Sequence, residues 1–262
     1  MNILDFQNMK QADDKIVMMT CYDYAFARIL ADSQVDCLLV GDSLAMVMYG
    51  YPSTVHATMD MMCLHTAAVA RGAGDKFVIG DLPFMSYRQG LTRTMENVAR
   101  LMQAGAQAVK LEGVDGNEDL VRHIVDSGVP VMGHLGLTPQ AVHQLGGHKV
   151  QGRDDGGEAR LLDQALRLQA AGCFAVVLEC VPALIAAAVT AQLSIPTIGI
   201  GAGSQTSGQV LVLHDMLDFD PKFNPTLLKK YATTHGAVMQ AANQYAQEVK
   251  SCAFPSSEQS YS

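Results

Sequence analysis

Ionisable side chains stand where successive apolar runs of this sequence end. Asp42 and Asp81 follow two neighbouring runs, and a third carboxyl group, Glu112, ends the next one. Carboxylates held close together repel one another unless a cation or a proton lies between them. Mg2+ prefers such oxygen ligands and keeps coordination positions open for water and substrate. The pattern predicts a magnesium site on Asp42 and Asp81, with Glu112 as a third ligand, directly or through water. The competing interpretation is that both aspartates cap helices.

Lys110 precedes Glu112 by two residues, so both side chains point to the same face of a strand. Together they would either bind an anion or form a structural ion pair. A lone buried lysine is also typical of Schiff-base aldolases. The neighbouring carboxylates favour instead a lysine that binds a substrate anion beside a metal ion.

Two further ionisable groups end apolar runs, His134 and Glu179. The stretch Ala104–Glu112 is echoed by Ala171–Glu179, which places Glu112 and Glu179 at equivalent strand ends. A zinc site is disfavoured, because the three histidines between residues 134 and 148 do not have the short sequence spacing that is typical of zinc ligands. These histidines are His134, His143 and His148.

The elements that must carry these groups alternate between β-rich apolar runs and helical segments. Such alternation indicates parallel βα units, and eight units in a chain of 262 residues favour a (β/α)8 TIM barrel. In that fold the carboxyl ends of the strands meet on one face, where active sites lie. A doubly wound sheet is the alternative, because a count of units does not show closure. The expected strands are Ile16–Thr20, Cys37–Val40, Phe77–Asp81, Ala108–Glu112, Val131–His134, Ala175–Glu179, Thr197–Ile200 and Val210–His214.

The chain is expected to form a single domain over residues 1–262, because no linker divides it. Helices are expected at Glu158–Ala171 and Pro182–Gln192. The polar, glycine-rich stretch Gly146–Gly157 is typical of an active-site loop or lid. The serine-rich tail from about residue 254 is expected to be mobile.

Composition excludes several classes of protein. A net charge of −8 without a basic run argues against nucleic-acid binding. The N-terminus does not resemble a signal peptide, and the most apolar stretch, residues 173–193, is interrupted by Glu179 and Pro182, so no membrane span is expected. Six cysteines without a C-x-x-C pair indicate reduced thiols and a cytoplasmic location. Only 17% of the residues are charged, which suggests burial against other copies of the chain.

Nine short motifs, in order along about residues 1–255, resemble the ketopantoate hydroxymethyltransferase family. They are Met19–Tyr24 (MTCYDY), Val40–Leu44 (VGDSL), His65–Val69 (HTAAV), Asp81–Met85 (DLPFM), Val109–Gly113 (VKLEG), Gly133–Gln140 (GHLGLTPQ), Lys149–Arg153 (KVQGR), Leu178–Pro182 (LECVP) and Gly199–Gly203 (GIGAG).

The resemblance implies a Mg2+-dependent (β/α)8 barrel. Such an enzyme transfers a hydroxymethyl group from 5,10-methylenetetrahydrofolate to 3-methyl-2-oxobutanoate in pantothenate biosynthesis. It also implies a cytoplasmic homo-oligomer, a decamer in well-known members. By the same resemblance, the metal ligands fall on Asp42, Asp81 and Glu112, the substrate-binding residues on Asp42, Ser43, Asp81, Lys110 and His134, and the catalytic base on Glu179.

The sequence departs from the family pattern at two places outside the metal and base positions. His148 stands where an aromatic residue is common in the family, and the tail reads SEQSY over Ser257–Tyr261 where a Glu-His-Ser-Phe form is common. Two alternative functions are a Mg2+-dependent carbon–carbon lyase of the phosphoenolpyruvate/pyruvate barrel type and a non-catalytic ligand-binding barrel. The lyase is disfavoured because the sequence lacks a Lys-x-Cys-Gly-His motif.

Overall fold

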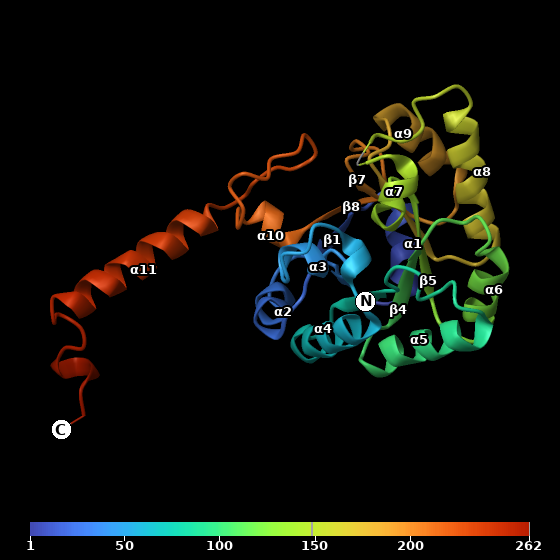
Figure 1. The fold of residues 1–262 in the computed structure, drawn as a ribbon. Coiled ribbons are helices and arrows are strands. Elements are labelled where there is room, and N and C mark those ends of the chain that lie inside the picture. The colour runs from blue at the N-terminus through green and yellow to red at the C-terminus, as the bar shows by residue number, and fades with distance from the viewer. Residues whose placement is uncertain (148, 262) are drawn as a thin grey trace. The chain divides into compact units, whose positions relative to one another are not determined.

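A computed structural model describes residues 1–147 and 149–261. Its parallel strands form a closed barrel in chain order, β1 to β8 (Figure 1). Because β1 pairs with β8, the sheet has no open edge, which confirms the barrel and excludes the doubly wound alternative. The strands are β1 Ile16–Thr20, β2 Cys37–Val40, β3 Phe77–Asp81, β4 Ala108–Glu112, β5 Val131–Gly136, β6 Ala175–Glu179, β7 Thr197–Ile200 and β8 Gly208–Leu211.

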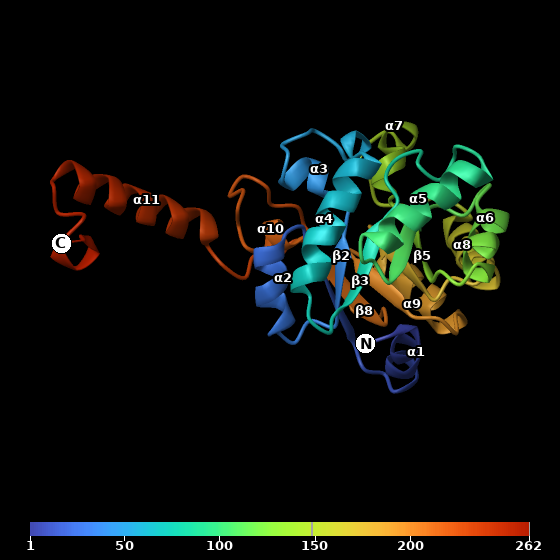
Figure 2. The same cartoon turned by 90° about the horizontal axis from the view of Figure 1, so that it is seen from below.

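The chain divides into two compact units, residues 1–212 and 213–262. Figure 2 shows the helices of the first unit around its strands. They are α1 Ile3–Gln11, α2 Tyr24–Ala31, α3 Leu44–Val47, η1 Thr54–His56, α4 Met59–Gly72, α5 Leu91–Gln103, α6 Glu118–Asp126, η2 Pro139–Ala141, α7 Val142–Leu145, α8 Gly157–Ala170 and α9 Ala183–Gln192. The second unit contains α10 Leu213–Met216, α11 Thr234–Lys250 and η3 Ser257–Gln259. A single domain with a mobile tail stays a prediction.

Most expected boundaries agree with the observed ones, but the eighth strand was placed wrongly. It is Gly208–Leu211 rather than Val210–His214, and His214 lies in α10. The register explains the shift, because Gly208 pairs with both Ile16 and Ile198, so the ladder begins two residues earlier. Strand β5 continues two residues beyond His134, to Gly136.

The barrel core consists of alternate residues of the strands. Since successive side chains of a strand point to opposite faces, Phe77 and Ile79 of β3 and Val177 of β6 share one interior cluster. Helix α1 adds Phe6, which packs edge-on against Phe77 and Phe174 with ring centroids 5.5 and 5.1 Å apart. Aromatic rings therefore fill the end of the barrel where the strands begin, and polar groups can gather only at the other end.

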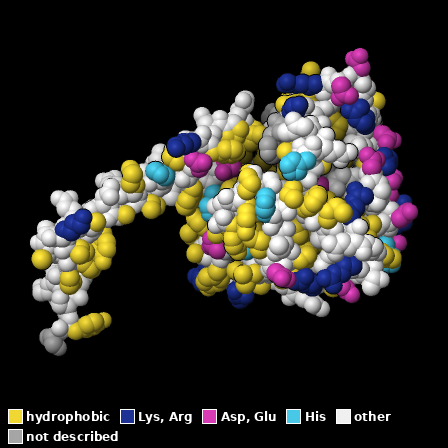
Figure 3. Space-filling view, viewed as in Figure 1, with side chains coloured by type: hydrophobic (Ala, Val, Ile, Leu, Met, Phe, Trp, Pro, Cys, Tyr) yellow, Lys and Arg dark blue, Asp and Glu magenta, His cyan; other side chains and the backbone are white. Residues whose placement is uncertain are grey.

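The outer surface of this unit carries charges of both signs. Over α6 and α8, Lys and Arg side chains alternate with Asp and Glu in Figure 3. Arg167 of α8, for example, contacts Asp115 and Glu118 at 2.9 Å. Within the described part of the chain, no helix combines the length and apolarity required to cross a membrane.

Candidate active site

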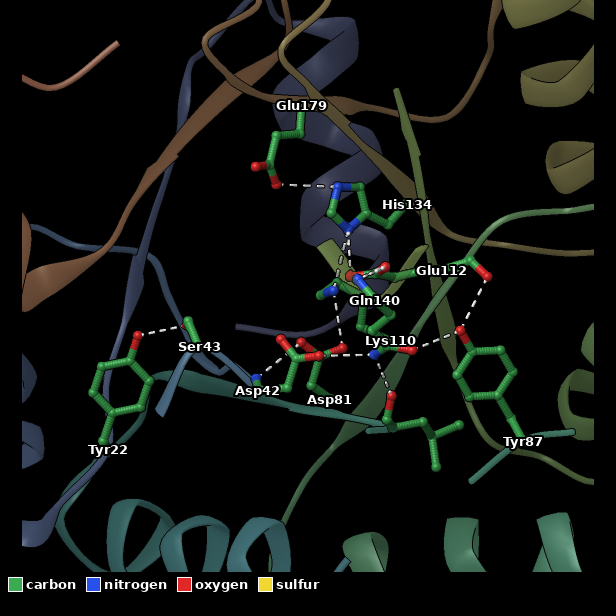
Figure 4. A network of polar contacts seen from close by, with 11 residues as sticks. Tyr22, Asp42, Ser43, Asp81, Tyr87, Lys110, Glu112, His134, Gln140 and Glu179 are labelled. Carbon is green, nitrogen blue, oxygen red and sulfur yellow. Dashed lines mark hydrogen bonds and ion pairs between the residues drawn. The ribbon is translucent and has the colours of Figure 1, made fainter. Parts of the chain in front are cut away.

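The alternation that builds the core also directs the polar strand ends into the barrel. Asp81 follows the inward residues Phe77 and Ile79 on β3 at intervals of two, and Glu179 follows Val177 on β6 in the same way. Strand register then brings the polar groups together, because Asp81 pairs with Lys110 and Glu112 pairs with His134. Figure 4 shows the resulting network.

A buried lysine joins the carboxylates of this network. Lys110 Nζ lies 2.9 Å from Asp81 Oδ1, and Asp81 Oδ2 accepts a hydrogen bond of 3.2 Å from the backbone N–H of Asp42. Burial lowers the pKa of Lys110, but the charges of Asp81, Glu112 and Asp42 outweigh burial and raise it above its ordinary value. The raised pKa favours the charged form of the lysine at neutral pH.

The aspartates do not cap helices. Asp42 Oδ2 accepts its hydrogen bond from the side chain of Gln140, whereas Asp81 forms an ion pair with Lys110 and accepts a hydrogen bond from the N–H of Asp42. The helix-cap interpretation is thus wrong for both residues. Ser43 occupies the N-cap position of α3, but its side chain makes no capping bond and contacts Tyr22 instead, with 2.8 Å between the two hydroxyl oxygens.

His134 lies between two glutamates, because β5 separates β4 from β6. Its Nδ1 is 3.5 Å from Glu112 Oε1, and its Nε2 is 3.3 Å from Glu179 Oε2, in a contact that is not aligned as a hydrogen bond. Burial and the charge of Lys110 lower the pKa of His134, but Glu112 and Glu179 raise it to about 9 overall. The imidazole is therefore a cation at neutral pH.

Gln140 and Tyr87 complete the network. The Gln140 side chain donates to Asp42 and accepts from the Tyr87 hydroxyl, and its backbone N–H donates to Glu112. The sequence analysis missed both residues as functional candidates. Gln140 lies inside one of the resemblance motifs, whereas Tyr87 gave no sequence signal.

The network carries four carboxylates, those of Asp42, Asp81, Glu112 and Glu179, but only two cations. Burial, followed by the charges of Asp81 and Glu112, raises the pKa of Asp42 well above its usual range. A divalent cation would relieve this excess of negative charge, and carboxylate oxygens suit Mg2+. In the described residues, no three His, Cys, Asp or Glu side chains form a ready-made metal cluster.

All seven residues that the sequence analysis singled out lie at this end of the barrel. They are Asp42, Ser43, Asp81, Lys110, Glu112, His134 and Glu179. The glycine-rich loop between α7 and α8 reaches the same end, because the N–H of Gln151 donates to the carbonyl oxygen of Cys180, beside Glu179, at 2.8 Å. His148, one of the two departures from the family pattern, lies outside the described residues. A lid role for the loop stays a prediction.

Comparison with known proteins gives a consistent result. The sequence model of the family described as ketopantoate hydroxymethyltransferase matches residues 1–257. The chain is 61% identical to 3-methyl-2-oxobutanoate hydroxymethyltransferase of Bdellovibrio bacteriovorus over 99% of both chains. It is 54% identical to the enzyme of that name from Legionella pneumophila over the full length of both chains.

Solved structures with lower sequence identity share the fold. A phosphonopyruvate hydrolase in complex with oxalate and Mg2+ superposes with a TM-score of 0.65 and 11% identity, over 98% of this chain and 93% of that one. A phosphoenolpyruvate phosphomutase from Streptomyces platensis gives a TM-score of 0.64 and 14% identity, over 96% and 88% of the two chains. At such identities the likeness concerns the barrel alone.

Proposed function

Since this chain belongs to the ketopantoate hydroxymethyltransferase family, we propose that the polar network at the carboxyl end of its barrel carries the reaction of that family. The chain is a 3-methyl-2-oxobutanoate hydroxymethyltransferase of pantothenate biosynthesis. Its co-substrate is 5,10-methylenetetrahydrofolate. This identification excludes the two alternative functions, a carbon–carbon lyase and a non-catalytic ligand-binding barrel.

One observation carries the assignment of the site. The buried Lys110 and the half-buried Glu179 lie on opposite sides of the His134 ring, with Lys110 Nζ 3.4 Å from Nδ1 and Glu179 Oε2 3.3 Å from Nε2, and Lys110 also contacts the carboxylate of Asp81. A 2-oxoacid has the matching chemistry, with a carboxylate that Lys110 can neutralise and a C3 proton that a carboxylate base can remove. Glu179 is more accessible than the other three carboxylates, which are buried, and 18% of its side chain is exposed against 4% for His134, so a substrate can reach it.

We assign Asp42 and Asp81 as metal ligands, with Glu112 beside them as a third ligand, directly or through water. When bound, Mg2+ supplies a Lewis acid that stabilises negative charge on the keto oxygen of the substrate. Ser43 lies next to Asp42 and offers a hydroxyl group to the same end of the oxoacid. Tyr22 holds that hydroxyl group through the 2.8 Å contact with Ser43.

Proton removal from C3 falls to Glu179. A general base must lie within reach of the proton that it takes. Glu179 is the last of the alternate residues of β6 whose side chains face the interior of the barrel. The carbanion at C3 then attacks the methylene carbon of the folate, so that the new C–C bond forms as the first of the two C–N bonds of that carbon breaks. The second C–N bond breaks as water adds to the same carbon, and the protons from C3 and from water end on the two released folate nitrogens. Water supplies the hydroxyl group that completes the product.

The half-reaction tests this assignment without the folate. The wild-type enzyme with Mg2+ should exchange the C3 proton of 3-methyl-2-oxobutanoate in D2O, followed by proton NMR. Glu179→Gln keeps the shape of the side chain but removes the base, and loss of a general base typically slows a reaction by about 10²–10⁴-fold. We expect exchange and overall turnover to fall together by that factor. Glu158→Gln, an exposed position on α8, is the matched control and should behave as wild type.

Two results would contradict the assignment. Exchange at the wild-type rate in Glu179→Gln would move the base to another group, with His134 as the next candidate. If the wild type failed to exchange without folate, enolisation would have to follow folate binding, and the order of steps given above would be wrong.

We also propose that the enzyme is a cytoplasmic homo-oligomer, a decamer as in well-known members of the family. All six cysteines are free thiols, which suits a reducing compartment. Exposed apolar side chains on the helices of the first unit, such as Ile29, Leu64 and Leu184, suit contacts between copies.

A further inference from the structure

Gln140 touches more of the polar network than its place in a short 3-10 helix would suggest. Helix η2 begins at Pro139, shortly after β5 ends at Gly136, which places residue 140 over the carboxyl ends of the strands. The side chain is buried, with 5% of the residue exposed. An uncharged residue so placed must act on its neighbours through hydrogen bonds.

The surroundings dictate the orientation of the Gln140 amide. Its Nε2 lies 2.8 Å from Asp42 Oδ2 and 3.0 Å from the carbonyl oxygen of Leu82, and a carbonyl oxygen only accepts hydrogen bonds. Its Oε1 accepts from the Tyr87 hydroxyl at 2.9 Å. The amide therefore presents its NH2 group to Asp42, and Tyr87 supports that orientation from the other side.

The same residue contacts a second carboxylate. The backbone N–H of Gln140 donates to Glu112 Oε2 at 3.0 Å, and the Tyr87 hydroxyl lies 3.2 Å from the carbonyl oxygen of Glu112. Gln140 thus connects a residue that follows β2 with a residue that ends β4, although the two strands are not neighbours. The bond to Asp42 engages Oδ2 and leaves Oδ1 without a hydrogen bond among the described residues.

We propose that Gln140, supported by Tyr87, is a positioning residue that holds Asp42 in the orientation needed to bind the divalent cation. This inference rests on the proposed function, since it takes Asp42 as a metal ligand. A glutamine satisfies the requirement because it donates a hydrogen bond without adding charge. A glutamate would place a further carboxylate beside Asp42, and an asparagine is one methylene group shorter.

Binding of Mn2+ to the metal-free, full-length enzyme tests the proposal independently of turnover. The free-Mn2+ EPR signal measures the Kd. Gln140→Met keeps the length of the side chain and the backbone bond to Glu112 but removes the amide. Loss of a hydrogen-bond partner of a metal ligand typically weakens metal binding by about 10–100-fold, and we expect that increase in Kd. Tyr87→Phe should raise the Kd in the same direction by a smaller factor. Gln144→Met, an exposed position on α7, is the matched control and should leave the Kd unchanged.

The outcomes separate this proposal from the proposed function. An unchanged Kd in Gln140→Met, while the wild type binds Mn2+, overturns the role of Gln140 alone. A wild type that does not bind Mn2+ overturns both the metal site and this inference. If Gln140→Met fails to fold, as judged by circular dichroism, Tyr87→Phe decides the question, because it removes a single oxygen atom. An unchanged Kd in that variant would then contradict the proposal.

Discussion

Asp81 connects the buried lysine of the network with the other aspartate. It pairs with Lys110 through one carboxylate oxygen and accepts the N–H of Asp42 through the other. Burial, although opposed by Lys110, raises the pKa of Asp81, and the charge of Glu112 raises it further.

Asp81→Asn should therefore weaken Mg2+ activation while the fold survives, because asparagine has nearly the same shape and no charge. We expect the Mg2+ concentration for half-maximal activity to rise by at least about tenfold, in line with losses at metal sites. Titration of activity with Mg2+ measures it, and Asp75→Asn, at an exposed position, is the control. Wild-type Mg2+ dependence in Asp81→Asn would exclude Asp81 as a ligand.

His134 should make stability depend on pH in a defined window. Its pKa in the folded protein is about 9, against 6.5 for an ordinary histidine. A raised pKa stabilises the fold fully below the unfolded value and loses its effect as pH rises through the folded value. The stabilisation by the charged imidazole should thus be complete below about pH 6.5 and vanish above about pH 9.

His134→Gln removes this charge, so the difference in unfolding free energy between wild type and variant should shrink from pH 6 to pH 10. The rise in the pKa of His134 on folding corresponds to a change in this free-energy difference of about 3 kcal/mol at most. Urea unfolding at a series of pH values measures the difference, and His123→Gln, at an exposed position, should show no such trend. A difference that stays constant or grows with pH would show that His134 is neutral in the folded protein.

At the scale of elements, the turn after β5 sets the position of Glu179. Gly136 pairs with Glu179 in the sheet, and the N–H of Leu137 donates to the Glu179 carbonyl oxygen at 2.8 Å. The φ angle of Gly136 is 88°, and an added Cβ would meet that same carbonyl oxygen and Val181. A side chain at residue 136 would therefore push the base out of place.

Gly136→Ala and Gly128→Ala form a matched pair, because Gly128 has a φ of 89° but no atom within 4 Å of an added Cβ. Both variants bear the strain of a positive φ, and only Gly136→Ala adds a clash. We expect Gly136→Ala to be less stable than Gly128→Ala by about 1–3 kcal/mol, the usual cost of overpacking. It should also lose C3 proton exchange, whereas Gly128→Ala should retain it. Equal stability and exchange in the two variants would show that the turn does not constrain Glu179.

For the whole molecule, the low content of charged residues and the exposed apolar side chains on its helices predict that copies of the chain form a homo-oligomer. Only 17% of residues are charged, and Leu184 on α9 is 86% exposed. Light scattering at micromolar concentration should give a mass several times the 28.1 kDa of one chain. A mass near that of one chain would contradict the expected homo-oligomer.

Much of the fold could be read from residue order. The apolar runs at β2, β3, β4, β6 and β7 have their expected bounds, because a strand buried on both faces leaves a continuous apolar signal. Gly105 and Gly172 end helices with φ angles of 108° and 100°, as glycines after helices do. The eighth strand was misplaced because Gly208 and Gln209 carry no such signal and belong to the strand only through their pairing with β1 and β7.

The sequence by itself determined which groups can act, since the period of two in a strand turns Asp81, Lys110, Glu112 and Glu179 toward one interior. Only the tertiary structure decided which side chains each of these groups contacts. Closure of the barrel sets the register that places His134 between Glu112 and Glu179, and the turn after β5 brings Gln140 to Asp42, which lies 98 residues away in the chain. Contacts of this kind depend on how distant strands align, and no local spacing in the sequence records that alignment.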